Sequence, residues 1–266
     1  MNTPNTGGDT YRVYTLRHGT RETTRAQVFL DYASYGEPDA PHTVDYYFWV
    51  LQSAQRVILV DTGFDADVAY RRDRTVLHDP VEMLRTTFGV NAEEVDTVIV
   101  THCHYDHIGN LSRFPNAQVF VTEAELDFAT SGALEKPLIG HFTENSEVDR
   151  LVQLRREGRL SSVREDATVV PGVRLLPVGG HTPGQLMVEV DTADGAVLVA
   201  SDALHFWEEL ERDMPFISSM DLPSTYGVFE MIRRRLNEGA THVIPGHDAR
   251  ALATMTSVTP DIGVLG

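Results

Sequence analysis

Residues 101–110 read "THCHYDHIGN", and within them His102, His104, Asp106 and His107 occupy six positions. Burying such groups without partners costs free energy, and a bound metal removes that cost. Imidazole and carboxylate are ligands for zinc, iron and manganese. Side chains repeat every two residues along an extended strand, so we expect His102 and His104 on one side. Asp106 and His107 follow in a turn and can face a second metal.

Three further candidates lie downstream, each where a strand-like run stops. His181 lies in "GGHTPGQ", Asp202 in "ASDALHF" and His247 in "IPGHD". Strand ends often carry functional residues, because a rigid sheet holds the loops that leave it. We assign one metal to His102, His104 and His181, and a second metal to Asp106, His107 and His247, with Asp202 as the bridge.

Composition excludes several classes of partner. The chain has 266 residues, 42% of them hydrophobic, and a formal net charge of −17. Such a charge repels phosphate backbones and anionic membranes, so we expect a small-molecule substrate and neither nucleic acid nor a membrane. Only one cysteine is present, which fits a reducing cytoplasm. We expect the polar residues 1–10 to be a disordered lead-in rather than a signal peptide.

Hydrophobic patterning predicts an α/β chain. Strand-like runs are expected at 11–19, 44–52, 56–63, 96–104, 117–125, 173–180, 185–192, 196–203 and 241–247. Helical spacing is expected at 80–90, 148–158 and 226–239. The runs at 44–52 and 56–63 are typical of a hairpin. We therefore predict that residues 11–266 form a single domain of packed sheets with helices outside, and the prediction allows a homodimer.

The order of the motifs resembles the metallo-β-lactamase superfamily. His-x-His-x-Asp-His is followed by Gly-His-Thr-Pro-Gly, Ser-Asp-Ala and Pro-Gly-His, and "DTG" at 61–63 precedes them. The resemblance implies an αββα sandwich, two mixed sheets with outer helices, and metals at one sheet edge. Asp202 resembles the bridging aspartate of glyoxalase II and of N-acyl-homoserine lactonases, whereas two-zinc lactamases commonly have a cysteine there. The stretch "SDALHFWEELERDMPF" is similar to the quorum-quenching lactonase branch, although His205 stands where the best-known relatives have tyrosine.

This resemblance implies a dinuclear hydrolase that opens a lactone ring. We expect two Zn²⁺ ions, with iron or manganese as alternatives, and a bridging hydroxide that attacks the carbonyl. Asp106 is expected to carry a proton to the departing alkoxide, and His205 to donate a hydrogen bond to the oxygen that gains charge. Cys103 is expected to be a packed core thiol.

Several alternatives stay open at this stage. The same metal site could serve a glyoxalase II-like thioesterase or another ester or β-lactam hydrolase, and a metal-binding module without turnover is a further alternative. Arg21 and Arg25 could bind a polar head group, but we expect them in solvent. Five apolar residues after Asp202 could wall an acyl-chain pocket or pack the core: Phe206, Trp207, Met214, Phe216 and Met220.

Overall fold

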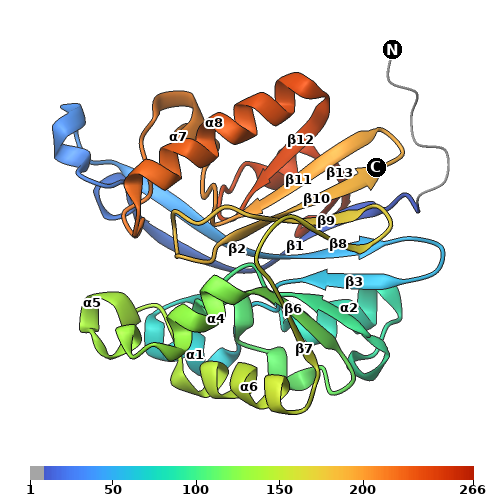
Figure 1. The fold of residues 1–266 in the computed structure, drawn as a ribbon. Helices are drawn as coiled ribbons and strands as arrows, with labels where there is room; N and C mark the ends of the chain where they lie inside the picture. Colours follow the sequence, from blue (N-terminus) through green and yellow to red (C-terminus); the bar gives the residue numbers. More distant parts are fainter. Residues whose placement is uncertain (1–8) are drawn as a thin grey trace.

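The protein is described from a computed structural model that covers residues 9–266. The lead-in predicted for residues 1–10 falls mainly on residues 1–8, which lie outside the described residues. Two β-sheets face each other, and helices cover their outer faces (Figure 1). The predicted αββα sandwich is thereby confirmed.

The first sheet is mixed and has nine strands. Along the sheet they are β13 (Thr256–Thr259), β14 (Ile262–Leu265), β1 (Arg12–Thr24), β2 (Pro41–Gln52), β3 (Val57–Val60), β5 (Thr97–Ile99), β6 (Gln118–Thr122) and β7 (Leu160–Val163), with β4 (Thr75–Val76) paired to β1. The predicted hairpin is confirmed as the antiparallel pair β2 and β3. From β3 to β7 the strands are parallel, so their carboxyl ends share one edge.

The second sheet has five strands and is also mixed. In order they are β12 (Ala240–Pro245), β11 (Gly195–Ser201), β10 (Leu186–Thr192), β9 (Val173–Pro177) and β8 (Ala167–Val170). Only β11 and β12 run parallel within it. Because these two strands are parallel, their carboxyl ends lie at the same edge of the second sheet, and so do the loops that follow them.

The helices are short, apart from α6 and α8. They are α1 (Ala66–Arg72), α2 (Pro80–Phe88), α3 (Tyr105–Ile108), α4 (Glu123–Thr130), α5 (Pro137–Gly140), α6 (Asn145–Arg156), α7 (Trp207–Arg212) and α8 (Leu222–Glu238). Figure 1 shows α2, α4 and α6 on the side of the first sheet, and α7 and α8 on the side of the second. Within residues 9–266, none of these helices combines the length and the apolar character that crossing a membrane requires.

Alternating side chains fill three layers of core. In β2, Phe48 packs towards the outer helices, whereas Trp49 packs between the two sheets. In β11, Val199 packs between the sheets, and Leu198 packs against α8 beside Phe229. Because both faces of these strands are buried, their sequences are continuously apolar rather than alternating. The sandwich holds the sheet edges rigid, and the candidate residues lie at those edges.

Candidate metal centre

The histidine motif follows the end of β5. The ladder of β5 stops at Ile99, and residues 100–103 lead without regular structure to His104, whose extended backbone precedes the one-turn helix α3. The rings of His102 and His104 lie with their centroids 4.5 Å apart. Asp106 and His107 lie in α3, so their predicted place in a turn is confirmed.

The second sheet and its loops supply the other three residues. His181 lies in the loop between β9 and β10, Asp202 directly follows β11, and His247 lies two residues after β12. None of the seven candidate residues is more than 8% exposed: His102, His104, Asp106, His107, His181, Asp202 and His247. Residues 145 positions apart in the chain, from His102 to His247, thus meet between the two sheets.

Asp202 lies between two groups of histidines. Its Oδ2 is 3.7 Å from His102 Nε2 and 3.4 Å from His181 Nε2. Its Oδ1 is 3.2 Å from His107 Nε2 and 3.1 Å from His247 Nε2. His104 belongs to the first group, because its Nδ1 is 2.9 Å from His181 Nε2.

The two groups match the two sets that the sequence predicts. His102, His104, His181 and Asp202 can bring one ligand atom each within 4.8 Å of the others, and Asp106, His107 and His247 can do the same. Asp202 therefore contacts both groups: Oδ1 faces the second group, and Oδ2 lies near both, since it is also 3.3 Å from His247 Nε2. This is the arrangement expected of a carboxylate shared by two metal ions.

The buried nitrogens of the centre fit bound metal. Among the described residues, His102 Nε2, His107 Nε2 and Asp202 Oδ1 lie together at the centre and are buried without a hydrogen-bond partner. Buried polar atoms are normally satisfied, and several orphans converging on one point call for a missing partner. The donor set of imidazole and carboxylate suits zinc, and it admits iron or manganese.

Other groups orient two of the imidazoles through the ring nitrogens that face away from Asp202. Asp61 Oδ2 lies 2.8 Å from His107 Nδ1, and Asp61 also accepts hydrogen bonds from the backbone N–H and the hydroxyl of Thr101, both at 2.8 Å. His247 Nδ1 lies 2.8 Å from the backbone oxygen of Asp45. Such partners fix which nitrogen of an imidazole faces the metal. Sequence reasoning noted Asp61 in "DTG" but gave it no role, although a carboxylate at a strand end was the signal.

The protonation states of the first group of histidines favour metal binding. Burial lowers the pKa of His102 and His181 well below the usual value, and the neighbouring histidines lower it further. These imidazoles are therefore neutral, as a ligand must be. For His107 burial acts in the same direction, but Asp202 and Asp61 outweigh it and raise the pKa.

His205 lies against Asp202. Its Nε2 is 3.2 Å from Asp202 Oδ2, its Nδ1 is 3.3 Å from Glu209 Oε2, and its ring stacks on Phe216 with centroids 3.8 Å apart. Burial lowers the pKa of His205, but the two carboxylates outweigh it and raise the pKa to about 9. The ring is 2% exposed. His205 is therefore placed to hold Asp202.

A polar wall faces the centre across a small cavity. Tyr46, Arg74, Tyr105 and Arg21 line it together with Asp106 and four of the other candidates. Arg74 Nε donates to Tyr105 Oη at 2.9 Å, and Tyr105 Oη lies 3.4 Å from Tyr46 Oη. The wall thus offers hydroxyl donors and guanidinium groups close to Asp106.

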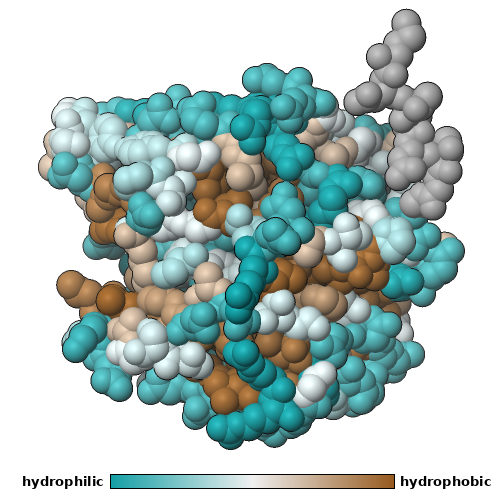
Figure 2. Space-filling model, in the orientation of Figure 1, coloured by the Kyte–Doolittle hydropathy of each residue, from teal (hydrophilic) through white to brown (hydrophobic). Residues whose placement is uncertain are grey.

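An apolar cavity of about 660 Å³ adjoins the centre at His104. It is lined mainly by residues of the segments 137–142 and 217–220, including Leu138, Phe142, Ile217 and Met220. Figure 2 shows apolar surface where α5 projects, at the left of the view. A pocket of this size and character suits a small apolar group.

The apolar residues singled out from the sequence divide between pocket and core. Met220 lines the apolar cavity, and Phe216 lines the small cavity at the centre. Phe206 and Met214 are buried in one core cluster. Trp207 is partly buried and packs against two others, the core between the sheets and the core beneath α8. Sequence reasoning missed α5 as a pocket wall, because "KPLIGH" is too short to show a period.

Two smaller predictions have opposite outcomes. Cys103 is buried and packs in the outer core of the first sheet, so its prediction as a core thiol is confirmed. Arg25 was expected in solvent, and this is wrong. Its guanidinium pairs with Glu208 of α7 at 2.6 and 2.8 Å, because the 3-10 turn Arg25–Gln27 lies beside that helix.

A sequence model described as "Metallo-beta-lactamase superfamily" matches residues 44–247. The chain belongs to the metallo-beta-lactamase superfamily. The match spans the "DTG" segment, the histidine motif and all three downstream residues of the candidate centre. Membership of this superfamily accounts for the mixed sheets, the outer helices and the crowding of histidines at one sheet edge.

Superfamily members that resemble this chain include N-acyl homoserine lactonases. One from Bacillus sp. is 25% identical over 236 residues, which is 82% of this chain and 88% of the relative. One from Bacillus cereus is 24% identical over 75% of this chain and 80% of the relative.

Solved structures of superfamily members share the fold. A quorum-quenching N-acyl homoserine lactone lactonase superposes with a TM-score of 0.78 at 22% identity, covering 96% of this chain and 99% of that one. AidC, described as a dizinc quorum-quenching lactonase, superposes with a TM-score of 0.71 at 18% identity, covering 97% and 95%.

Proposed function

We propose that this protein is a metal-dependent hydrolase that opens lactone rings, and that N-acyl homoserine lactones are its substrates. The observation that carries the proposal is Asp202, whose carboxylate lies between two groups of buried imidazoles and contacts both. The sequence relatives named as N-acyl homoserine lactonases support the substrate class.

We assign the ligands as the sequence predicts. His102, His104 and His181 would hold one zinc ion, Asp106, His107 and His247 would hold the second, and Asp202 would serve both. When bound, such ions would make water a nucleophile near neutral pH and would polarise a carbonyl oxygen. Asp61 keeps His107 oriented throughout, because its carboxylate is fixed by Thr101.

The residues around the centre have separate tasks in ring opening. Asp106 is the most exposed of the seven and lines the small cavity, so its carboxylate can hold a proton and pass it to the departing alkoxide. Ring opening also creates a carboxylate on the product. Arg21 and Arg74 line the same cavity and can attract that charge, in a chain whose net charge is −17.

The apolar cavity beside His104 holds the acyl chain in this proposal. Its walls are mainly apolar, and His104 and Phe142 line both this cavity and the small cavity at the centre, so an acyl chain bound in one leaves the lactone at the other. A thioester or a β-lactam would use the same centre but make different use of this cavity.

The decisive experiment combines metal analysis with a pH-indicator assay on N-acyl homoserine lactones, a glutathione thioester and a β-lactam. We expect close to two zinc equivalents and acid release from the lactones. Faster turnover of the thioester or the β-lactam would replace the lactonase assignment. Metal without turnover of any ester would indicate a binding module, and activity without metal would contradict the centre itself.

Three broader proposals accompany this function. Residues 11–266 act as one domain, supported by the pairing of β1 with β14 across the chain. The single, buried Cys103 supports a cytoplasmic location. A homodimer stays a prediction, which gel filtration with light scattering tests.

A further inference from the structure

Glu125 is a fully buried carboxylate that the reaction does not use. It lies in the first turn of α4, and its exposed fraction is 0%. A buried carboxylate needs several donors to offset its lost hydration. The donors that hold Glu125 come from the histidine motif and from the loop that carries His181.

One oxygen of Glu125 holds the histidine motif. Oε1 accepts a hydrogen bond from the backbone N–H of Cys103 at 2.8 Å. Cys103 stands between His102 and His104, so this bond fixes the backbone that carries both ligands. The Cys103 side chain packs in the core of the first sheet, and its thiol also lies beside Glu125, since burial and then this carboxylate raise the pKa of the thiol.

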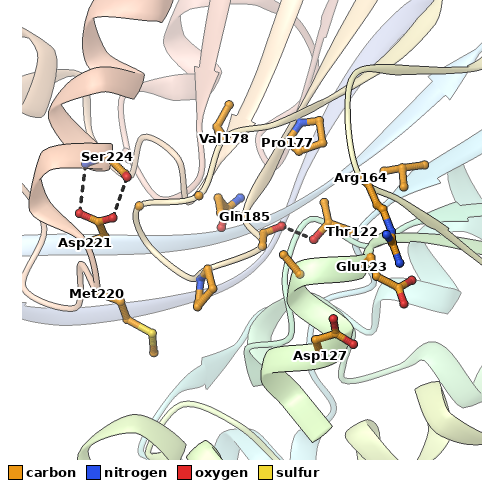
Figure 3. Close-up of a pocket in the computed structure, with 16 residues that line it drawn as sticks. Thr122, Glu123, Asp127, Arg164, Pro177, Val178, Gln185, Met220, Asp221 and Ser224 are labelled. Carbon is orange, nitrogen blue, oxygen red and sulfur yellow. Dashed lines mark hydrogen bonds between the residues drawn. The ribbon is translucent and has the colours of Figure 1, made fainter. Parts of the chain in front are cut away.

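The other oxygen holds the loop that carries His181. Oε2 accepts from the hydroxyl of Thr182 at 2.7 Å and from the backbone N–H of Gly184 at 3.0 Å. Thr122, the residue that caps α4, adds a bond from its hydroxyl to the backbone oxygen of Gly184 at 2.6 Å, which Figure 3 shows as a dashed line.

The loop reaches α4 only because position 184 is glycine. A Cβ there would lie 2.1 Å from the backbone nitrogen of Glu125 and 2.4 Å from Thr122 Oγ1. The outer side of the loop borders an open cavity of about 720 Å³, drawn in Figure 3. The hydrogen bonds to α4 therefore hold the loop from one side, and the backbone N–H groups of Met220 and Asp221 hold it at Gly180 from the other.

We propose that Glu125 is a positioning residue that sets the metal affinity of the group formed by His102, His104 and His181. One carboxylate joins the two segments that carry all three histidines, which are 77 residues apart between His104 and His181. The inference rests on the metal centre of the proposed function and not on the identity of the lactone.

Glu125→Gln tests the proposal on the full chain. The amide keeps the shape but can accept on one side only, so one of the two segments loses its anchor. We expect the zinc affinity of one site, measured by competition with a chromophoric chelator, to fall about 10- to 100-fold, the range for groups that orient ligands. The visible spectrum of the cobalt-loaded protein should change as well, because the ligands move.

Glu123→Gln is the matched control. It makes the same chemical change two positions earlier in α4, where the carboxylate contacts Ser162 and Arg155 rather than the loop. It should bind zinc as the unaltered protein does. Equal zinc affinity in Glu125→Gln and Glu123→Gln, even with a lower melting temperature for Glu125→Gln, would overturn the proposal.

Thr182→Val covers the case in which Glu125→Gln does not fold. It removes one donor to Glu125 at similar volume, and we expect a several-fold loss of zinc affinity; unchanged affinity would again overturn the proposal. The unaltered protein separates the two levels of inference. If it binds no zinc, the proposed centre fails. If it binds two ions and the variants bind them equally well, only the role of Glu125 fails.

Discussion

Asp202 contacts both groups of histidines, so a substitution there tests both metal sites. Asp202→Asn keeps the size but removes the charge that faces both groups of histidines. We expect zinc affinity to fall by at least ~100-fold, the upper end of what outer-shell partners contribute, and turnover to be nearly lost. Elemental analysis, turnover and circular dichroism measure this on one preparation. Two tightly bound ions with normal turnover would mean that Asp202 is not the bridge.

His205 has two candidate roles that one variant separates. If it holds Asp202, as its 3.2 Å contact suggests, His205→Ala should weaken zinc binding about 10- to 100-fold and lower turnover in parallel. If it instead donates to the substrate oxygen, turnover should fall ~10²–10³-fold with metal content unchanged. We expect the first result. A lower melting temperature alone would reduce His205 to a packing residue under Phe216.

The residues that form and support the centre differ in how readily the sequence predicts their roles. His102, His104, Asp106 and His107 lie within six positions, so their spacing alone predicts a metal site. Glu125 leaves no such pattern, because its partners, two backbone N–H groups and the Thr182 hydroxyl, lie 22 to 59 positions away. A carboxylate that binds backbone amides constrains the fold at a distance, and a single sequence carries no local sign of it.

At the scale of elements, the strands of the sandwich core were predictable and their ends were not. The run 117–125 was expected to be one strand, but β6 stops at Thr122 and α4 begins at Glu123, because the Thr122 hydroxyl caps the helix. The hairpin of β13 and β14 was not predicted. Its strands have only four residues each and gain their order from pairing with β1.

Helix α5 sets the preference for acyl chains in our proposal. Each CH₂ buried in the adjoining cavity contributes ~0.8 kcal/mol, so kcat/KM should rise about fourfold per CH₂ until the cavity is full. Ile217→Ser, in the wall opposite α5, should lower kcat/KM for long chains about tenfold and change short chains little. Val258→Ser alters a similarly exposed residue on β13 and should have no effect. Equal losses for all chain lengths would place the acyl chain elsewhere.

Glu147 in helix α6 makes the folding stability of the protein depend on pH. Burial, followed by Asp65 and Glu144, raises the pKa of Glu147 to about 7 from 4.5. A raised carboxyl pKa means that ionisation opposes folding, so the penalty is absent below about pH 4.5 and complete above about pH 7. Glu147→Gln should therefore raise the melting temperature at pH 8, on the order of a few degrees, and not at pH 4.5. Asp149→Asn, at an exposed neighbouring position, is the control, and a gain independent of pH would contradict the assignment.

For the whole molecule, the centre joins distant parts of the chain. The histidine motif comes from the first sheet, and Asp202 and His247 follow strands of the second. Arg25 adds a tie outside the centre, since it links the segment after β1 to α7 through Glu208. The sequence predicts which residues meet at the centre, whereas ties such as this one depend on how loops lie over the finished sandwich.

The backbone at Ser201, just before Asp202, has a φ of 48°, a left-handed conformation that an L-residue adopts at a cost of roughly 1–2 kcal/mol. Glycine adopts it without that cost, and one nucleotide change converts a serine codon of the AGY type to glycine. The Ser201 hydroxyl, however, lies 2.9 Å from Thr101 Oγ1 and 3.2 Å from Asp61 Oδ2, in the network that orients His107. Laboratory evolution for heat resistance alone should therefore enrich Ser201→Gly, and selection for turnover should remove it. Deep sequencing of both populations would measure how much folding stability this lineage gives up to keep its chemistry.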